Sequence, residues 1–133
     1  MIKKNKLQIK KSPHGNITKV INKSSKYYKG FGELYFSQIK KNKIKGWKKH
    51  TKMTMNIKVI MGKVKFILSK DMKSFKKIII SENDKFLLTI SKNIFFAFQG
   101  LDKKNEILNF SNIKHSKKEC INLPLNRINY KWN

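Results

Sequence analysis

An all-β fold, built as a sandwich or a barrel, is the fold class that the sequence predicts. From Gly30 onward, short runs of aromatic and β-branched residues alternate with lysine, asparagine and glycine about every 8 to 12 residues. No window keeps helical spacing over about twelve residues, and there is no internal repeat. The 133 residues correspond to about one domain, with enough surface to bury a core.

The expected strands are short segments bounded by turn residues. In order, they are Phe31–Ile39, Ile44–Lys49, Met55–Met61, Lys63–Ser69, Lys76–Ser81, Phe86–Ile90, Ile94–Gln99, Glu106–Asn112 and Glu119–Leu123. Period-2 alternation places one set of side chains inward, namely Ile57, Val59, Met61, Val64, Phe66 and Leu68. The alternate residues Lys58, Lys63 and Lys65 are expected to face outward. Gly62 separates the two alternating strands and is expected to form the turn of a tight hairpin.

Residues 1–28 are expected to form an N-terminal arm, followed by a barrel domain at residues 29–133. Residues 1–29 carry nine lysines and a turn signal at positions 12–15. A short apolar alternation at Ile17, Val20 and Ile21 predicts one strand there. We expect the arm to be mobile or to cross to a partner subunit.

The charge of the chain is strongly positive, with 32 basic and 7 acidic residues and a net charge of +25. A field of this size attracts polyanions whatever the fold. All basic residues except Arg127 are lysines, and the chain is also rich in isoleucine and asparagine, two other residue types with A/T-rich codons. Genome composition therefore explains much of the charge. Specific reading of bases would favour arginine, so nucleic acid is expected to bind only non-specifically.

Disulfide bonds and bound metals are not expected. Cys120 is the single cysteine, which fits a reducing cytoplasm, and His14, His50 and His115 lack metal-ligand spacing. No cofactor is implied. The lysine-rich N-terminus is not followed by a long apolar run, so neither a signal peptide nor a membrane span is expected.

General acid–base chemistry at a barrel mouth is the remaining chemical possibility, and His50 is its leading candidate. It ends a strand-like segment beside Trp47 and three lysines, whose charges would depress the pKa of the imidazole. A neutral imidazole is a competent base near pH 7. A histidine without any chemical role remains the alternative. Phe95, Phe96 and Phe98 are expected to pack in the core rather than to stack on bases.

Several short motifs occur in an order that resembles the dTDP-4-dehydrorhamnose 3,5-epimerase family, a metal-independent branch of the cupins. They are KGWKKH at residues 45–50, MTMN at 53–56, Gly62, FQGL at 98–101 and NYKW at 129–132. The likeness is closer to the epimerase-related subfamily and covers about residues 29–132. It implies a cupin-like jelly-roll barrel that dimerises and holds a deoxynucleotide sugar in its mouth.

The resemblance also implies roles for individual positions. Lys29 and Phe31 match a segment that reaches the nucleotide, and Lys45 matches an arginine that holds the diphosphate. Lys48 stands at the position of the family's proton-abstracting histidine, and Ile113 lies near that of its tyrosine acid. Phe96 takes the place of the cupin metal-binding histidine. The aspartate that orients the histidine has no clear counterpart in Asn122–Asn126.

The expected function is therefore that of a nucleotide-sugar epimerase or ketoisomerase in deoxysugar or polysaccharide biosynthesis. The expected catalytic residues are His50, Lys48 and Tyr35. The expected substrate-binding residues are Lys45, Lys29, Phe31, Trp47 and Asn56. A non-catalytic sugar-nucleotide-binding accessory protein and a basic polyanion-binding module are the alternatives. The resemblance implies a homodimer, and the apolar edge segment Lys29–Ile39 is suited to pair across its interface.

Overall fold

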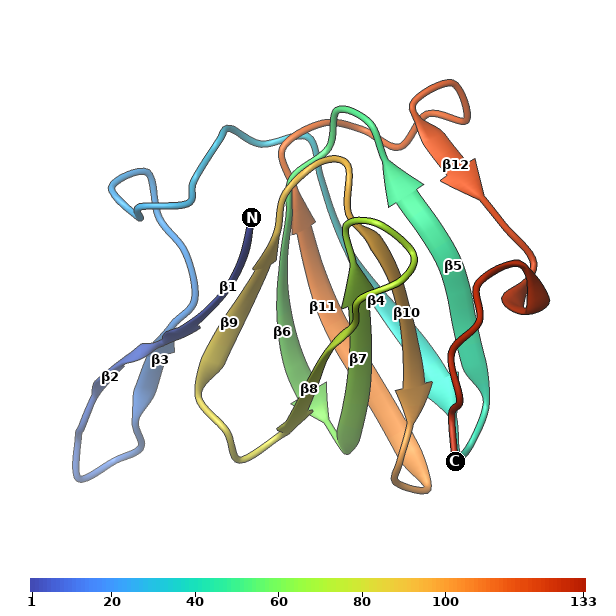
Figure 1. The fold of residues 1–133 in the computed structure, drawn as a ribbon. Helices are drawn as coiled ribbons and strands as arrows, with labels where there is room; N and C mark the ends of the chain where they lie inside the picture. Colours follow the sequence, from blue (N-terminus) through green and yellow to red (C-terminus); the bar gives the residue numbers. More distant parts are fainter.

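The computed structural model describes residues 1–133 as two facing antiparallel sheets, a cupin-like jelly-roll sandwich (Figure 1). The first sheet has the strand order β1-β9-β6-β11-β4, and the second has the order β12-β5-β10-β7-β8. The strands are β1 (Ile2–Lys6), β2 (Gln8–Lys10), β3 (Ile17–Lys19), β4 (Glu33–Lys40), β5 (Ile44–His50), β6 (Met55–Met61), β7 (Lys63–Ser69), β8 (Lys76–Ser81), β9 (Phe86–Ile90), β10 (Phe95–Gly100), β11 (Lys104–Ser111) and β12 (Cys120–Asn122). A short 3-10 helix, η1 (Leu125–Arg127), follows β12. No helix in the structure is long and apolar enough to cross a membrane.

Every expected strand is present, and the expected all-β fold is confirmed. The strands β6, β7, β8 and β9 have the predicted bounds, because alternating apolar residues and sharp turn residues define both their faces and their ends. Gly62 joins β6 to β7 with a φ of +77°, as expected for a tight hairpin.

Two predicted side-chain directions in β6 are wrong. Met61 is 41% exposed, because the pairing of β6 with β11 shifts register between Val59 and Met61 and leaves Ile60 as an extra residue. Lys58 was expected to face solvent but is only 6% exposed. Its Nζ donates hydrogen bonds to the carbonyl oxygens of Val59 and Asp84, which compensate part of the cost of burying the ammonium group.

The hydrophobic core has two parts. A cluster of 16 buried residues lies between the sheets and includes Phe96 and Phe98. A smaller cluster of five, with Phe95 and Trp47 among its members, lies on the outer face of the second sheet. Strand β10 thus buries both faces, since its alternate side chains enter different clusters. The expectation that Phe95, Phe96 and Phe98 pack in the core is confirmed.

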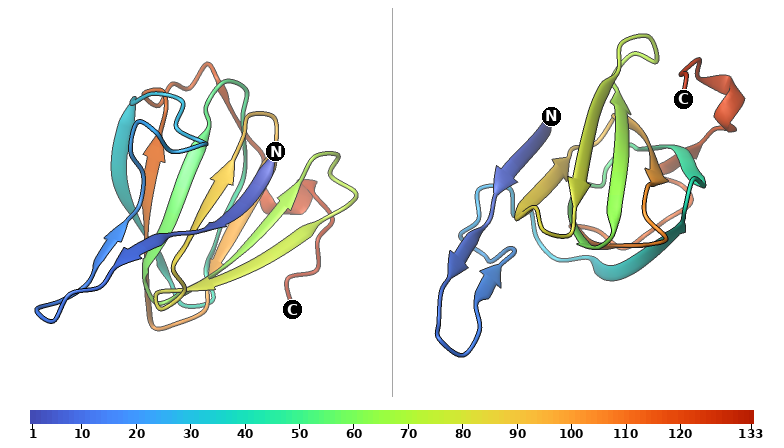
Figure 2. Two further views of the ribbon diagram at one scale, coloured as in Figure 1. Left: turned by 90° about the vertical axis from the view of Figure 1, so that its left-hand side faces the viewer. Right: turned by 90° about the horizontal axis from the view of Figure 1, so that it is seen from below.

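The N-terminal segment differs from the predicted arm. It contains three strands instead of one, and β1 pairs with β9 as the edge of the first sheet. The β2–β3 hairpin projects away from the sandwich in all the views of Figures 1 and 2. Residues 27 and 28 return to the outer face of the first sheet, where the Tyr27 carbonyl accepts a hydrogen bond from Asn56 and Tyr28 packs on Phe110. The division into an arm at residues 1–28 and a barrel domain at residues 29–133 stays a prediction.

Candidate active site

A cavity of about 440 Å³ lies between the two sheets. Strand β5 and strand β10 form one wall, and strands β4, β6 and β11 contribute the opposite wall. The sequence-predicted site residues that border it are Tyr35, Lys45, Trp47, Lys48 and His50. Apolar side chains such as Phe96, Phe98 and Ile107 line the same space, so polar groups here are partly removed from water.

A β-bulge in β5 determines which of its side chains face this cavity. Lys48 pairs with Phe96, and Lys45 pairs with Phe98, so β5 has an extra residue between these two pairs. Gly46 occupies the bulge with a φ of +146°, and a Cβ there would lie 2.4 Å from the Cβ of Ala97. Lys45 and Lys48 therefore both border the cavity, although simple alternation would place them on opposite faces.

His50 forms a buried pair with Glu119 at the end of β5. The His50 Nδ1 atom lies 2.5 Å from Oε1 of Glu119, and both residues are buried. Strand β12 pairs with β5 directly beside them, with Cys120 opposite His50. The other carboxylate oxygen of Glu119 accepts hydrogen bonds from the backbone N–H groups of Lys52 and Met53. Phe96 stacks on the imidazole with ring centroids 5.9 Å apart.

The electrostatics of this pair favour a neutral imidazole beside an ionised carboxylate. Burial lowers the pKa of His50 below its ordinary value, and the opposing pull of Glu119 does not reverse the shift. Burial alone would raise the pKa of Glu119, but hydrogen bonds from His50 and from two backbone N–H groups lower it overall. Nδ1 therefore donates its proton to Glu119, which leaves Nε2 as the basic nitrogen.

Tyr35 lies on the opposite sheet and also borders the cavity. It occupies β4 directly across from Asn109 of β11, whose Nδ2 donates a 2.8 Å hydrogen bond to the Tyr35 hydroxyl oxygen. Burial raises the pKa of Tyr35, so its hydroxyl stays protonated near pH 7. The cavity thus holds a candidate base on one sheet and a candidate acid on the other.

Two predicted substrate-binding residues, Trp47 and Asn56, have side chains that are engaged outside the cavity. Trp47 lies in β5, but its indole ring packs in the outer cluster, where Trp132 lies 5.8 Å away between ring centroids. Asn56 is buried and accepts a 2.6 Å hydrogen bond from Thr89. The contact of these two residues with substrate stays a prediction; packing holds the Trp47 ring in the outer cluster, and hydrogen bonds hold the Asn56 side chain.

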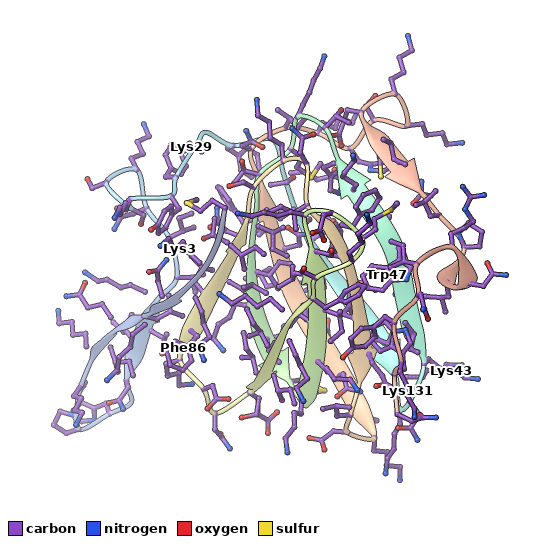
Figure 3. The ribbon with its side chains drawn as sticks, in the orientation of Figure 1. Lys3, Lys29, Lys43, Trp47, Phe86 and Lys131 are labelled. Carbon is purple, nitrogen blue, oxygen red and sulfur yellow. The ribbon has the colours of Figure 1, made fainter.

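Lys29 and Phe31 also lie outside the cavity of the single chain. Phe31 is 64% exposed and packs on Phe110, with ring centroids 5.6 Å apart. Lys29 precedes β4 in the chain, and Figure 3 shows it at the upper left, well separated from Trp47 and Lys43 at the right. A contact between these residues and a ligand in the cavity of the same chain is therefore not supported.

Glu119 is the important residue that sequence reasoning missed. The resemblance places the orienting acid at Asn122–Asn126, but the residue that holds His50 lies three positions before that segment, just before β12. Only seven acidic residues are present in the chain, so an acid at the first position of the predicted strand Glu119–Leu123 was a usable signal. His115 was also missed as a cavity residue; it borders the cavity from the loop that follows β11, two residues after Ile113.

Together, the fold and cavity define the class: a cupin-like jelly roll with a buried histidine–carboxylate pair beside a cavity between its sheets. Comparison with solved structures confirms the resemblance found in the sequence. A dTDP sugar isomerase from Desulfovibrio desulfuricans superposes with a TM-score of 0.88 at 21% sequence identity, covering 98% of this chain and 90% of that chain.

Two further solved structures belong to the same comparison. A dTDP-4-dehydrorhamnose 3,5-epimerase from Bacillus anthracis with TDP and PPi bound gives a TM-score of 0.84 at 16% identity, covering 98% of this chain and 84% of that chain. A sugar 3,4-ketoisomerase from Thermoanaerobacterium thermosaccharolyticum in complex with TDP gives 0.80 at 16% identity, covering 90% and 86%. No protein-family model matches the sequence, and no curated protein matches it. At these identities the comparison establishes the fold, and the activity must be argued from the site.

Proposed function

We propose that this protein is an isomerase or epimerase that acts on a nucleotide-linked 4-keto-6-deoxy sugar. The observation that carries the proposal is the buried His50–Glu119 pair, which presents a neutral imidazole to the cavity between the sheets. A protein that only binds a sugar has no need for a desolvated histidine oriented by a buried carboxylate. The solved structures with this fold include enzymes for dTDP-linked sugars, which supports the substrate class.

The chemistry begins with removal of a proton next to the keto group. His50 Nε2 takes this proton, the C–H electron pair forms the enolate, and the carbonyl oxygen gains the negative charge. Glu119 stabilises the resulting imidazolium through Nδ1–H. Lys48 borders the same cavity and provides a positive charge for the enolate oxygen. We assign the role of base to His50 rather than to Lys48, because only His50 has a carboxylate partner, Glu119. Lys48 is then the donor to the enolate oxygen.

Proton return completes the reaction. Tyr35 on the opposite sheet donates its hydroxyl proton to the carbon, which gives inversion, and the phenolate is stabilised by the Asn109 N–H before solvent reprotonates it. In that route the His50 imidazolium releases its proton to solvent. Return of the proton from His50 to the neighbouring carbon would instead move the keto group, provided that the hydroxyl proton on the first carbon passes to the former carbonyl oxygen through the enediol. The stereochemical result therefore depends on which of these two groups delivers the proton.

Substrate binding in this proposal uses Lys45, which borders the cavity at the start of β5 and would hold the diphosphate as a point charge. Lys29 and Phe31 remain candidates for a nucleotide contact only if a second copy of the chain brings them to the cavity. Trp47 and Asn56 are not part of the proposed site, because their side chains are engaged elsewhere.

The decisive test measures solvent deuterium incorporation at carbons 3 and 5 of dTDP-4-keto-6-deoxyglucose, which detects proton abstraction even when no product accumulates. We expect incorporation with the natural protein and with His14→Asn, a control on the exposed hairpin turn. Thermal stabilisation by the nucleotide sugar without deuterium incorporation would instead establish the binding-only function. Neither effect with several sugar nucleotides would refute both.

A homodimer is the second part of the proposal. Strand β4 is an edge of the first sheet, and its outward side chains Leu34 and Phe36 are 52% and 64% exposed. Such an open apolar edge is a liability in a monomer and pairs readily with a second copy. Light scattering near physiological ionic strength should give the dimer mass, and a monomer at high micromolar concentration would contradict this. A cytoplasmic location stays a prediction from the sequence.

A further inference from the structure

A second and larger cavity, of about 770 Å³, lies at the end of the sandwich where β4 turns into β5 and β10 turns into β11. In Figure 1 these turns lie at the lower end of the molecule, and His50 lies at the upper end of β5. Lys45 borders both cavities, so the second cavity lies next to the first one.

Positive charge dominates this second cavity. Five lysines line it, namely Lys40, Lys43, Lys45, Lys103 and Lys104, and Glu106 is the only acidic residue among its lining residues. None of these lysines forms an ion pair, because the single ion pair of the structure joins His50 and Glu119. Lys40 and Lys104 are direct cross-strand partners, an arrangement in which like charges repel and destabilise the sheet. A bound anion would relieve that repulsion.

Asn105 makes the floor of this cavity a rigid, buried structure. Its Oδ1 accepts hydrogen bonds from the N–H groups of Lys63 and Asp102, and its Nδ2 donates to the carbonyls of Ile39 and Asp102. One side chain thus ties together the ends of β4, β7 and β11. Gly62 leaves the space for it, since a Cβ there would lie 2.4 Å from the Asn105 Oδ1 atom. The lysines therefore extend from a preorganised frame.

The scarcity of apolar residues and the lack of aromatic rings in this cavity argue against a nucleobase as its main occupant. Ile39 and Met61 are its only hydrophobic residues, and no aromatic ring lines it. A base would find no ring on which to stack, although stacking is a common source of base affinity in proteins. The five ammonium groups also exceed what the two phosphates of a nucleoside diphosphate need for neutralisation. The cavity therefore fits a ligand with more phosphates.

We propose that this five-lysine cavity is a binding site for a tripolyphosphate chain, either free or as part of a nucleoside triphosphate. Lys40, Lys43, Lys103 and Lys104 surround the chain from two turns, and Lys45 contacts it at the junction with the first cavity. Lysine suits this role because it neutralises phosphate as a mobile point charge without fixed geometry. The site does not rest on the proposed sugar chemistry, since inorganic tripolyphosphate contains neither sugar nor nucleoside.

The experiment compares the natural protein with two double variants of equal net charge by titration calorimetry with sodium tripolyphosphate, at about physiological salt. Lys103→Gln with Lys104→Gln removes two cavity lysines, and Lys10→Gln with Lys11→Gln removes two adjacent lysines of the exposed hairpin. We expect the cavity variant to weaken binding about tenfold and the hairpin variant less than about twofold. Equal weakening by both variants, or no binding by the natural protein, would overturn the proposal.

Further titrations distinguish the sources of the ligand. Tighter binding of dTTP than of tripolyphosphate assigns the site to a nucleoside triphosphate, and equal binding assigns it to the inorganic chain. A short DNA duplex should lose affinity equally with both double variants, because general charge governs that interaction. A tenfold loss for DNA but not for tripolyphosphate in the cavity variant would make this a nucleic-acid surface and refute the site. His50→Asn should leave tripolyphosphate binding intact, which separates this proposal from the proposed enzymatic function.

Discussion

The two cavities use charge in opposite ways. In the first, one histidine and one carboxylate are buried, joined by a 2.5 Å contact, and further fixed by backbone N–H groups. In the second, five exposed lysines share a space with a single acid and form no ion pair. Proton transfer requires a desolvated group of defined tautomer, whereas attraction of a polyanion requires many long cations still near water. In the two functions proposed above, one small barrel separates reactivity from affinity along its length.

The largest expected effect belongs to His50→Asn, which should abolish the function of one cavity and leave that of the other intact. His50→Asn should reduce deuterium incorporation by about 10³-fold, since general base catalysis contributes about 10²- to 10⁴-fold. Its binding of tripolyphosphate should change less than about twofold, because His50 does not border the lysine cavity. Exchange kinetics and calorimetry on the same preparation provide both values. Retention of more than about a tenth of the exchange rate would show that another group is the base.

Glu119→Gln should have the next largest effect, about a 10²-fold loss of exchange together with lower stability. The amide has only one acceptor oxygen, so an N–H of the glutamine would face either His50 or the N–H groups of Lys52 and Met53. We expect a cost of about 1 to 3 kcal/mol in the free energy of unfolding, measured by urea denaturation. Natural stability and natural exchange in this variant would contradict the orienting role.

Lys48→Met and Lys49→Met form a matched pair across the wall of the first cavity. Lys48 borders the cavity, whereas Lys49 lies over the Phe95 ring on the outer face, 4.6 Å from its centroid. The loss of Lys48 should reduce exchange about 10- to 100-fold by removing a charge near the enolate, and the loss of Lys49 should change it less than about twofold. Equal effects would show that only the total charge matters. Initial exchange rates at saturating substrate measure the difference.

The pH dependence should show the smallest but most specific effect. Because the pKa of His50 lies below its ordinary value of 6.5, kcat/KM for exchange should hold down to pH 6.5 and fall only at lower pH. The unfolded chain takes up this proton more readily, so stability linked to His50 is present above pH 6.5 and is lost as the pH falls. Glu119, whose pKa is also lowered, adds acid sensitivity below 4.5.

A comparison of variants sharpens this pH test. Glu119 opposes the downward shift of the His50 pKa, so Glu119→Gln should move the acid limb of its remaining activity to still lower pH. A limb that moves upward, or that starts above pH 6.5 in the natural protein, would show that the titrating group is not His50. Rate profiles at constant ionic strength check this, since the lysine cavity also responds to salt.

Most of the fold could be predicted from the sequence, because each kind of strand has its own pattern between turn residues. A strand that buries one face alternates apolar and polar residues, and a strand that buries both faces is apolar throughout. The pattern from Met55 to Ile90 placed β6 to β9 at their observed bounds. The pattern was less informative at the N-terminus, where β1 has polar and basic residues at most positions and gains its partner only from distant β9. It also failed at Met61, because a register shift depends on the partner strand.

The sequence by itself determined the β class, the strand positions and the positive charge, and it singled out His50 as a candidate base. Only the tertiary structure decided that Glu119, 69 residues away, holds His50, and that the Gly46 bulge turns Lys45 and Lys48 toward one cavity. It also decided that Trp47 packs outside and that five lysines gather at one end. The physical reason is that alternation and turn propensity act between chain neighbours, whereas a buried polar pair and a cavity depend on which strands become partners.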